Sequence, residues 1–446
     1  MKLKNIAVAL MSLVLLVPIG GGAVLADNHQ DSEPEVDTAA VDFRASTDHL
    51  FSEHAYLIIT AMRKAYNGDP DAAEALEAVY QNGYDIQAAI TKLYGEEAGE
   101  TFIKNWTDHI GYFMEYAEAV ANDNEEERQK AFNNLQEYTY ISGEFQERLT
   151  NGRVTEETVV KVLTTHINQV TGSYDAYVAE DYEEAYTIQS EAMEHLVNTV
   201  SKSLSKAYTD QFADMFNHTE AVTDAANLRT DFNFLLAEHF ALLQQAMQNN
   251  YDDAPGFEAN RELLNANTEQ LAAAIASIYG EEAGEKFYDI WSNHIMYFME
   301  YVEAVANDNP EEKEAALKQL EQYREDFSQF ISVATNDRVE AETLSQGLQV
   351  HVEQALGTFN SYVEGEYEET WTIAREGYAH MFMPAKLLSS AIVQQFPEMF
   401  DDMPGMPETG MGGTADSNNL NWILWTLPVL ALAGITVFTR RKQVQE

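Results

Sequence analysis

Residues 106–124 read WTDHIGYFMEYAEAVANDN, and residues 291–309 read WSNHIMYFMEYVEAVANDN, so the two stretches differ at only four of 19 positions. The second stretch lies 185 residues after the first. Aligned at this offset without a gap, residues 42–208 and 227–393 are identical at 63 of 167 positions. Two copies of this length indicate a tandem pair of domains, because solenoid repeats are usually about 20–50 residues long.

The repeated sequence has the pattern of α-helices. Apolar residues recur at spacings of three and four, and short polar breaks such as Asn122-Asp123-Asn124 separate the segments. Thr155 precedes Glu156 and Glu157, an arrangement typical of a helix start. We therefore predict an all-α fold with two tandem homologous helical bundles of six or seven helices each. The expected boundaries are 41–216 for the first repeat, 217–226 for a linker and 227–400 for the second repeat.

Both ends of the chain predict export and anchoring. Residues 1–26 combine Lys2 and Lys4, an apolar run and a small-residue site ending at Ala26, which together predict a cleaved signal peptide. Residues 27–40 are expected to form a flexible acidic lead. At the other end we predict a stalk at 401–421, a transmembrane segment at 422–439 and a basic cytoplasmic tail at 440–446.

The stalk carries a motif that resembles a known sorting signal. Met406-Pro407-Glu408-Thr409-Gly410, followed by a spacer, an apolar span and basic residues, resembles the LPxTG-type cell-wall sorting signal of Gram-positive surface proteins. The resemblance covers the last 41 residues and implies that a sortase cleaves between Thr409 and Gly410 and joins Thr409 to peptidoglycan. Met406 stands where that family has Leu, and a plain membrane anchor is the alternative. Either arrangement tethers the protein outside the cell.

Composition narrows the choice of partners. The chain has 74 Asp and Glu against 26 Lys and Arg, giving a net charge of −48, which would repel nucleic acids and anionic lipid surfaces. Hydrophobic residues make up 45% of the chain, so the acidity indicates a solvated surface over real cores, suited to salty or alkaline surroundings. Cysteine is absent, so His, Asp, Glu, Tyr or Met would have to hold any metal ion.

Eight of the eleven histidines form four pairs at the 185-residue offset. Apolar or aromatic residues at helical spacing around them, such as Trp106 and Phe113 around His109, predict that they face a core. One glutamate precedes His54 directly and another lies four residues before His195, and both recur in the second repeat. Imidazoles with carboxylates suit zinc, iron or copper. The candidate ligands are His54, His109, His166, His195, Glu53 and Glu191, and their counterparts His239, His294, His351, His380, Glu238 and Glu376.

Two interpretations of these histidines stay open at this stage, a metal site in each repeat and a buried hydrogen-bonded network. The favoured function is a binding or interaction module, in which a His/Glu metal centre in each repeat is one of these two interpretations. The alternatives are a metal-dependent redox or hydrolytic enzyme, which would need an open coordination position, and a structural spacer or adhesin. No catalytic residue is predicted, because the chain contains no G-x-S-x-G, Walker, H-E-x-x-H or dinucleotide-binding motif.

The helical repeats also resemble the helical region of exported proteins from Bacillus-like bacteria that are often labelled copper amine oxidase. Amine oxidases of that family use a modified Tyr in an Asn-Tyr-Asp/Glu setting and a His-x-His pair of metal ligands. This chain has Asn250-Tyr251-Asp252 in one repeat only and no His-x-His. The resemblance therefore implies an exported helical protein and does not carry amine oxidation with it.

Overall fold

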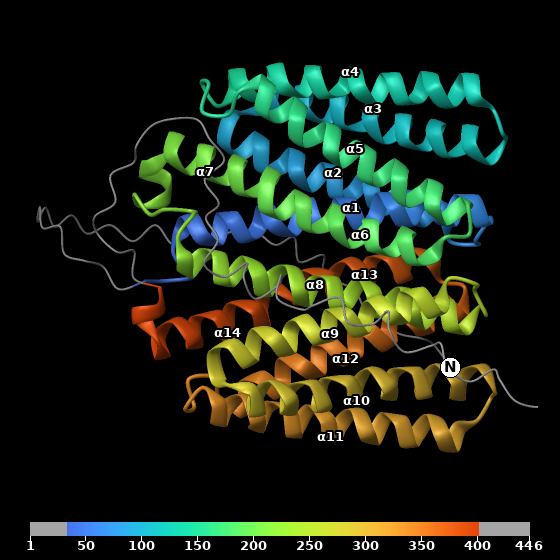
Figure 1. The fold of residues 1–446 in the computed structure, drawn as a ribbon, viewed down its shortest axis with the longest axis vertical. Coiled ribbons are helices and arrows are strands. Elements are labelled where there is room, and N and C mark those ends of the chain that lie inside the picture. The colour runs from blue at the N-terminus through green and yellow to red at the C-terminus, as the bar shows by residue number, and fades with distance from the viewer. Residues whose placement is uncertain (1–33, 401–446) are drawn as a thin grey trace, which may run out of the picture.

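The computed structural model describes residues 34–400, which contain fourteen α-helices and no β-strand (Figure 1). The all-α prediction is confirmed for this part of the chain. Among these residues, none of the helices has the length and apolar character needed to cross a membrane. The predicted signal peptide (1–26), sorting motif (406–410) and transmembrane segment (422–439) lie outside the described residues.

Each repeat contributes seven α-helices. The first repeat contains α1 (Ala39–Asn67), α2 (Ala72–Tyr94), α3 (Glu96–Ala121), α4 (Glu125–Leu149), α5 (Glu156–Val178), α6 (Tyr182–His195), a π-helical turn (Leu196–Ser201) and α7 (Lys202–Gln211). The second contains α8 (Asp224–Tyr251), α9 (Phe257–Tyr279), α10 (Glu281–Ala306), α11 (Pro310–Ala334), α12 (Ala341–Glu364), α13 (Tyr367–His380) and α14 (Phe382–Gln395). Short 3-10 turns follow at Ala213–Phe216 and Pro397–Met399.

Capping side chains and glycine junctions set the boundaries of several helices. The side chains of Thr38, Thr155 and Thr223 accept hydrogen bonds from backbone N–H groups in the first turns of α1, α5 and α8. Gly95 and Gly280 separate the second and third helices of each repeat with φ of 88° and 91°, a conformation that glycine adopts without steric cost. The same junction chemistry thus recurs in both repeats.

The two repeats contact each other in a reciprocal way. Helix α1 packs against its counterpart α8, α2 packs against α13, and α6 packs against α9. Because α2 corresponds to α9 and α6 corresponds to α13, exchanging the repeats reproduces the same set of contacts. This is the contact pattern of an isologous dimer, here formed within one chain. In Figure 1 the helices α1 and α8 lie between the outer pairs α3–α4 and α10–α11.

The two repeats differ from each other in their last two helices. In the first repeat the π-helical turn joins α6 to α7 without a break, whereas α13 ends at His380 and α14 starts at Phe382. Pro384 occupies the position that corresponds to Thr199 and has no N–H to donate to a preceding carbonyl. Proline is accepted in the first turn of α14, where no intrahelical partner is needed, so the chain starts a new helix there.

A candidate metal centre in each repeat

Three histidines come together in each repeat, and we call each set a triad. The first triad consists of His54 on α1, His109 on α3 and His166 on α5; the second consists of His239 on α8, His294 on α10 and His351 on α12. All six side chains are buried. In the second triad, one ring nitrogen of each histidine lies within 4.8 Å of the other two.

The closest contact within each triad joins two Nε2 atoms. The distance is 3.2 Å between His294 and His239, and 3.4 Å between His109 and His54. The Nδ1 atom of His294 donates to the carbonyl oxygen of Trp291, which leaves a lone pair on Nε2 of the neutral ring. Holding one ring nitrogen in this way orients the other toward the centre of the triad, as is usual for metal-ligating histidines.

The third histidine of each triad has no hydrogen-bond partner in the protein. Both ring nitrogens of His166 and of His351 are buried without one, and so is Nδ1 of His54 and of His239. A neutral imidazole always carries one N–H, and an unsatisfied buried donor costs about 1–3 kcal/mol. A hydrogen-bonded network within the protein therefore accounts for only part of each triad.

The triads are electrically neutral at pH 7. Burial lowers the pKa of His109, His166 and His351 to about 3. Burial, reinforced by the neighbouring imidazoles, holds the pKa values of His54, His239 and His294 well below their usual range. Their lone pairs are available to a metal ion without the loss of a proton, since only the deprotonated imidazole can bind one.

Aromatic rings hold the triads in place. Tyr138 stacks on His109 with ring centroids 4.5 Å apart, and Tyr323 stacks on His294 at 4.4 Å. Trp106 and Trp291 lie against the same histidines at 4.6 and 4.7 Å. The aromatic face predicted around His109 is buried, and it serves here to fix the orientation of the imidazoles.

The fourth predicted histidine of each repeat does not join its triad. His195 donates from Nε2 to the carbonyl oxygen of Val162 at 2.9 Å, and His380 donates in the same way to Gly347 at 2.9 Å. A carbonyl oxygen only accepts, so Nε2 carries the hydrogen and cannot bind a metal in this arrangement. These two histidines tie α6 to α5 and α13 to α12.

The four predicted carboxylates also lie away from the triads. Glu191 and Glu376 are exposed. In the second repeat, the residues close enough together to hold a metal ion are histidines only. Glu53 and Glu238 are buried, but successive residues of a helix point about 100° apart, so each glutamate turns away from the histidine that follows it.

Two asparagines bind the buried glutamates, and sequence reasoning missed them. Asn82 donates to Glu53 at 2.8 Å and to the carbonyl of Leu50, and Asn267 repeats both bonds with Glu238 and Leu235. The signal was available, because Asn82 and Asn267 are identical at the 185-residue offset.

The surroundings of the two glutamates differ. Burial opposes ionisation of Glu53, but the guanidinium of Arg375, 2.9 Å away, outweighs it and lowers the pKa to about 2. The position that corresponds to Arg375 is Ser190, which donates to Glu238, and there burial prevails and raises the pKa to about 7. Each partner comes from the opposite repeat, so the interface between the repeats sets the charge of both carboxyls.

Comparison with protein-family models, with curated proteins and with solved structures finds no match for this chain.

Proposed function

We propose that this chain is an exported protein tethered to the wall or membrane of a Gram-positive bacterium, in which two tandem homologous bundles each bind one metal ion. The observation that carries the metal proposal is the convergence of His239, His294 and His351, because one ring nitrogen of each lies within 4.8 Å of the other two in a buried, neutral cluster. The first triad has its histidines at matching positions on α1, α3 and α5, but among the described residues only the second triad brings three ring nitrogens within 4.8 Å of one another.

Three points of physical chemistry support a metal ion. Imidazoles from three different helices face one point, which is how helical bundles build metal centres. The rings are already deprotonated, so binding does not compete with protons at neutral pH. An ion would also use buried ring nitrogens that have no protein partner, such as those of His351.

The ligand set favours zinc or copper over iron. Both ions accept three imidazoles and leave a fourth position for water or another ligand. Non-haem iron sites of the open type use two histidines and a carboxylate, and none of the predicted carboxylates lies in the second triad.

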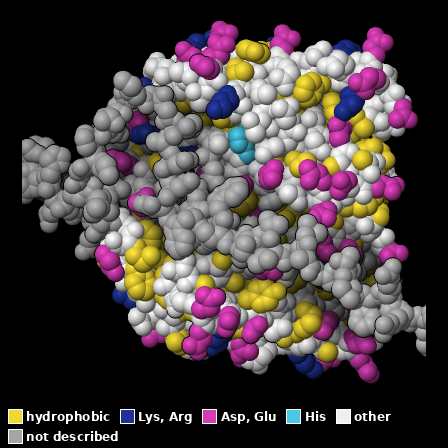
Figure 2. All heavy atoms as spheres, in the orientation of Figure 1, with side chains coloured by type: hydrophobic (Ala, Val, Ile, Leu, Met, Phe, Trp, Pro, Cys, Tyr) yellow, Lys and Arg dark blue, Asp and Glu magenta, His cyan; other side chains and the backbone are white. Residues whose placement is uncertain are grey.

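A binding role fits the rest of the molecule better than a catalytic one. Figure 2 shows Asp and Glu spread over the visible face, with fewer Lys and Arg among them, as expected for a solvated surface. The triads lie below this surface among aromatic rings, where an ion is held firmly and exchanges slowly. We propose a surface-displayed metal-binding module, in which each ion stabilises its bundle or takes part in binding a partner.

The test is the metal content of the purified chain, measured by elemental mass spectrometry after incubation with zinc or with copper and removal of free ion. We expect two ions per chain, and almost none in the variant with His109→Ala and His294→Ala. The matched control carries His195→Ala and His380→Ala, which lie outside the triads and should leave two ions bound. A folded wild-type chain that retains no metal, or a control that loses metal equally, would refute the proposal.

A further inference from the structure

The second triad offers a metal ion three neutral nitrogens and no negative charge. Burial lowers the pKa of His239, His294 and His351, and the neighbouring side chains that lower it further are other histidines. No carboxylate of residues 34–400 raises the pKa of these rings. The carboxyl of Glu238, the residue before His239, is bonded to Asn267 instead. An ion in this triad therefore keeps its full charge, because the protein supplies no anion to balance it.

Aromatic side chains surround the three imidazoles. The ring of Trp291 lies 4.8 Å from that of His239, measured between centroids. The rings of Phe240 and Phe298 lie 5.8 and 6.2 Å from His351. These aromatic side chains are buried, so the ion would sit in surroundings of low polarity. The cost of moving an ion from water into such surroundings grows with the square of its charge, so a monovalent ion incurs about a quarter of the cost of a divalent ion of the same size.

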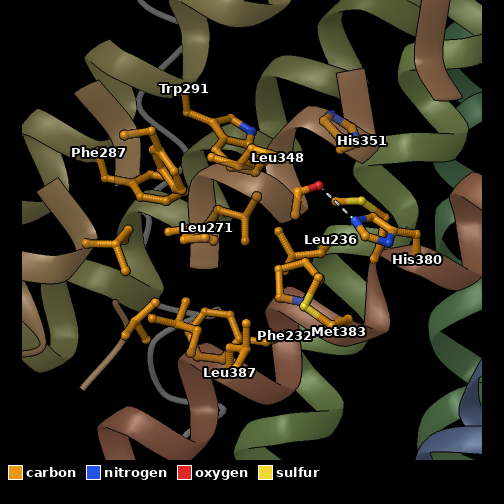
Figure 3. A pocket seen from close by; sticks show the side chains of 18 residues that line it. Phe232, Leu236, Leu271, Phe287, Trp291, Leu348, His351, His380, Met383 and Leu387 are labelled. Atoms are coloured by element: carbon orange, nitrogen blue, oxygen red, sulfur yellow. Dashed lines mark hydrogen bonds between the residues drawn. The ribbon is translucent and has the colours of Figure 1, made fainter. Parts of the chain in front are cut away.

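A cavity beside the triad supplies no fourth ligand. Its volume is about 40 Å³, and its lining includes His351, His380 and the backbone of Gly347 (Figure 3). The other lining side chains are aliphatic or aromatic, and the Nε2 of His380 is already bonded to the Gly347 carbonyl, as the dashed line shows. A buried water molecule needs two to four polar partners, so this lining does not hold one in place.

The hydroxyl of Tyr323 does not supply an anionic ligand either. Tyr323 stacks on His294, and its hydroxyl has no hydrogen-bond partner among residues 34–400. A side chain that binds a metal ion firmly has to lose its proton first. Burial holds the pKa of Tyr323 well above its usual range, so the phenol stays protonated at neutral pH. The three imidazoles are therefore the whole ligand set that the second repeat provides.

We propose that the second triad holds copper in its cuprous state, Cu(I), bound by one nitrogen each of His239, His294 and His351 without a fourth ligand. This inference rests on the proposed metal site and names its ion and oxidation state. Cu(I) carries a single charge and is stable with three ligands. Zn(II) carries two charges and takes a fourth ligand, and Cu(II) favours a tetragonal set of four or more. The triad should therefore bind Cu(I) in preference to both divalent ions.

The test compares ion affinities in the full purified chain with His166→Ala, which removes the first triad. Cu(I) is supplied under nitrogen with ascorbate, in competition with the coloured Cu(I) chelator bicinchoninate. Zinc is supplied in competition with a zinc-binding dye, and Cu(II) binding is followed by electron paramagnetic resonance. We expect one Cu(I) per chain, with a dissociation constant at least a hundredfold below those of zinc and Cu(II). Adding His351→Ala to the same chain should abolish this binding.

A second variant guards against misfolding of the first. His109→Ala removes the first triad through a different side chain and should show the same preference, with an unchanged circular dichroism spectrum. Zinc or Cu(II) bound as tightly as Cu(I) by the folded variants would overturn this inference and leave the proposed metal site standing. The absence of any bound ion in the folded variants would refute both. Cu(I) bound equally well after His351→Ala would also overturn the inference, because the ion would lie outside the triad.

Discussion

The two repeats place the same three histidines at the same positions, yet the residues around them differ in charge and in packing. Glu53 is ionised beside Arg375, whereas Glu238 has Ser190 as its partner and a pKa of about 7. In the first repeat the hydrogen-bonded side chains of Gln146 and Tyr208 line a small hollow, whereas the lining of the cavity in the second repeat includes His351. A duplicated bundle can thus keep its buried histidines while the residues around them change.

The largest effect is expected from removing the cation that pairs with Glu53. Arg375→Ala leaves the buried Glu53 carboxylate with only the ring of His49, 3.8 Å away, as an ion-pair partner, so we expect a loss of about 3–5 kcal/mol in the free energy of unfolding. The matched change Ser190→Ala in the other repeat removes one hydrogen bond and should cost only about 1 kcal/mol. Urea unfolding at pH 7 measures both. Equal losses would mean that the two carboxyls have equivalent surroundings.

The next effect is a pH dependence of the free energy of unfolding, which should differ between the same two carboxyls. The folded-state pKa of Glu238 is raised to about 7, so the folded chain binds this proton more tightly than the unfolded chain does. The stabilisation that the Glu238 carboxyl gives the fold is fully present below about pH 4.5 and is lost as the pH rises through 7. At 1.36 kcal/mol per pKa unit, this amounts to about 3 kcal/mol.

The variant Glu238→Gln tests this titration. It should be as stable as wild type at pH 4.5 and more stable at pH 8, by about 3 kcal/mol in urea unfolding. The control Glu53→Gln should show the opposite sign at neutral pH, because the pKa of Glu53 is lowered to about 2 and its charge stabilises the fold above the unfolded pKa. A difference between wild type and Glu238→Gln that does not change with pH would contradict this assignment.

The third effect concerns the triads and tests whether they are equivalent. If each binds an ion, a metal concentration of 100 times Kd stabilises the corresponding repeat by about 2.7 kcal/mol. His166→Ala should remove this gain from the first repeat only, and His351→Ala from the second only. Zinc-dependent shifts in thermal unfolding, measured on each variant, reveal the contribution of each triad. A shift that survives in the double variant would mean that the ion binds elsewhere.

Much of the fold could be predicted from the sequence, because helical periodicity and the duplicated stretch are local signals. The inward direction of His54, His109 and His166 followed from the apolar residues that share their faces. The approach of His109 and His166 to His54 depends on how α1, α3 and α5 pack, which spacing along one helix does not specify.

The positions of the candidate residues that lie outside the triads have geometric reasons. Glu53 is adjacent to His54 in sequence, but a rotation of about 100° per residue directs it to Asn82 and to the other repeat. Glu191 shares a helical face with His195, but that face is exposed at the glutamate. Arg375 gave no local signal, because it acts across the interface and its counterpart is Ser190.

The smallest effect concerns the histidines outside the triads, where the two repeats should behave alike. His195 and His380 each donate one hydrogen bond to a backbone carbonyl from a half-buried position, so replacing either by Ala should cost about 1 kcal/mol. Burial lowers the pKa of both rings, so the loss should be largest above pH 6.5, where wild type holds them neutral in both states. Urea unfolding of the two variants at pH 8 measures this cost, and metal content should stay unchanged. If His380→Ala costs much more than His195→Ala, the cavity that His380 lines contributes to the difference, and the two repeats diverge even in their backbone contacts.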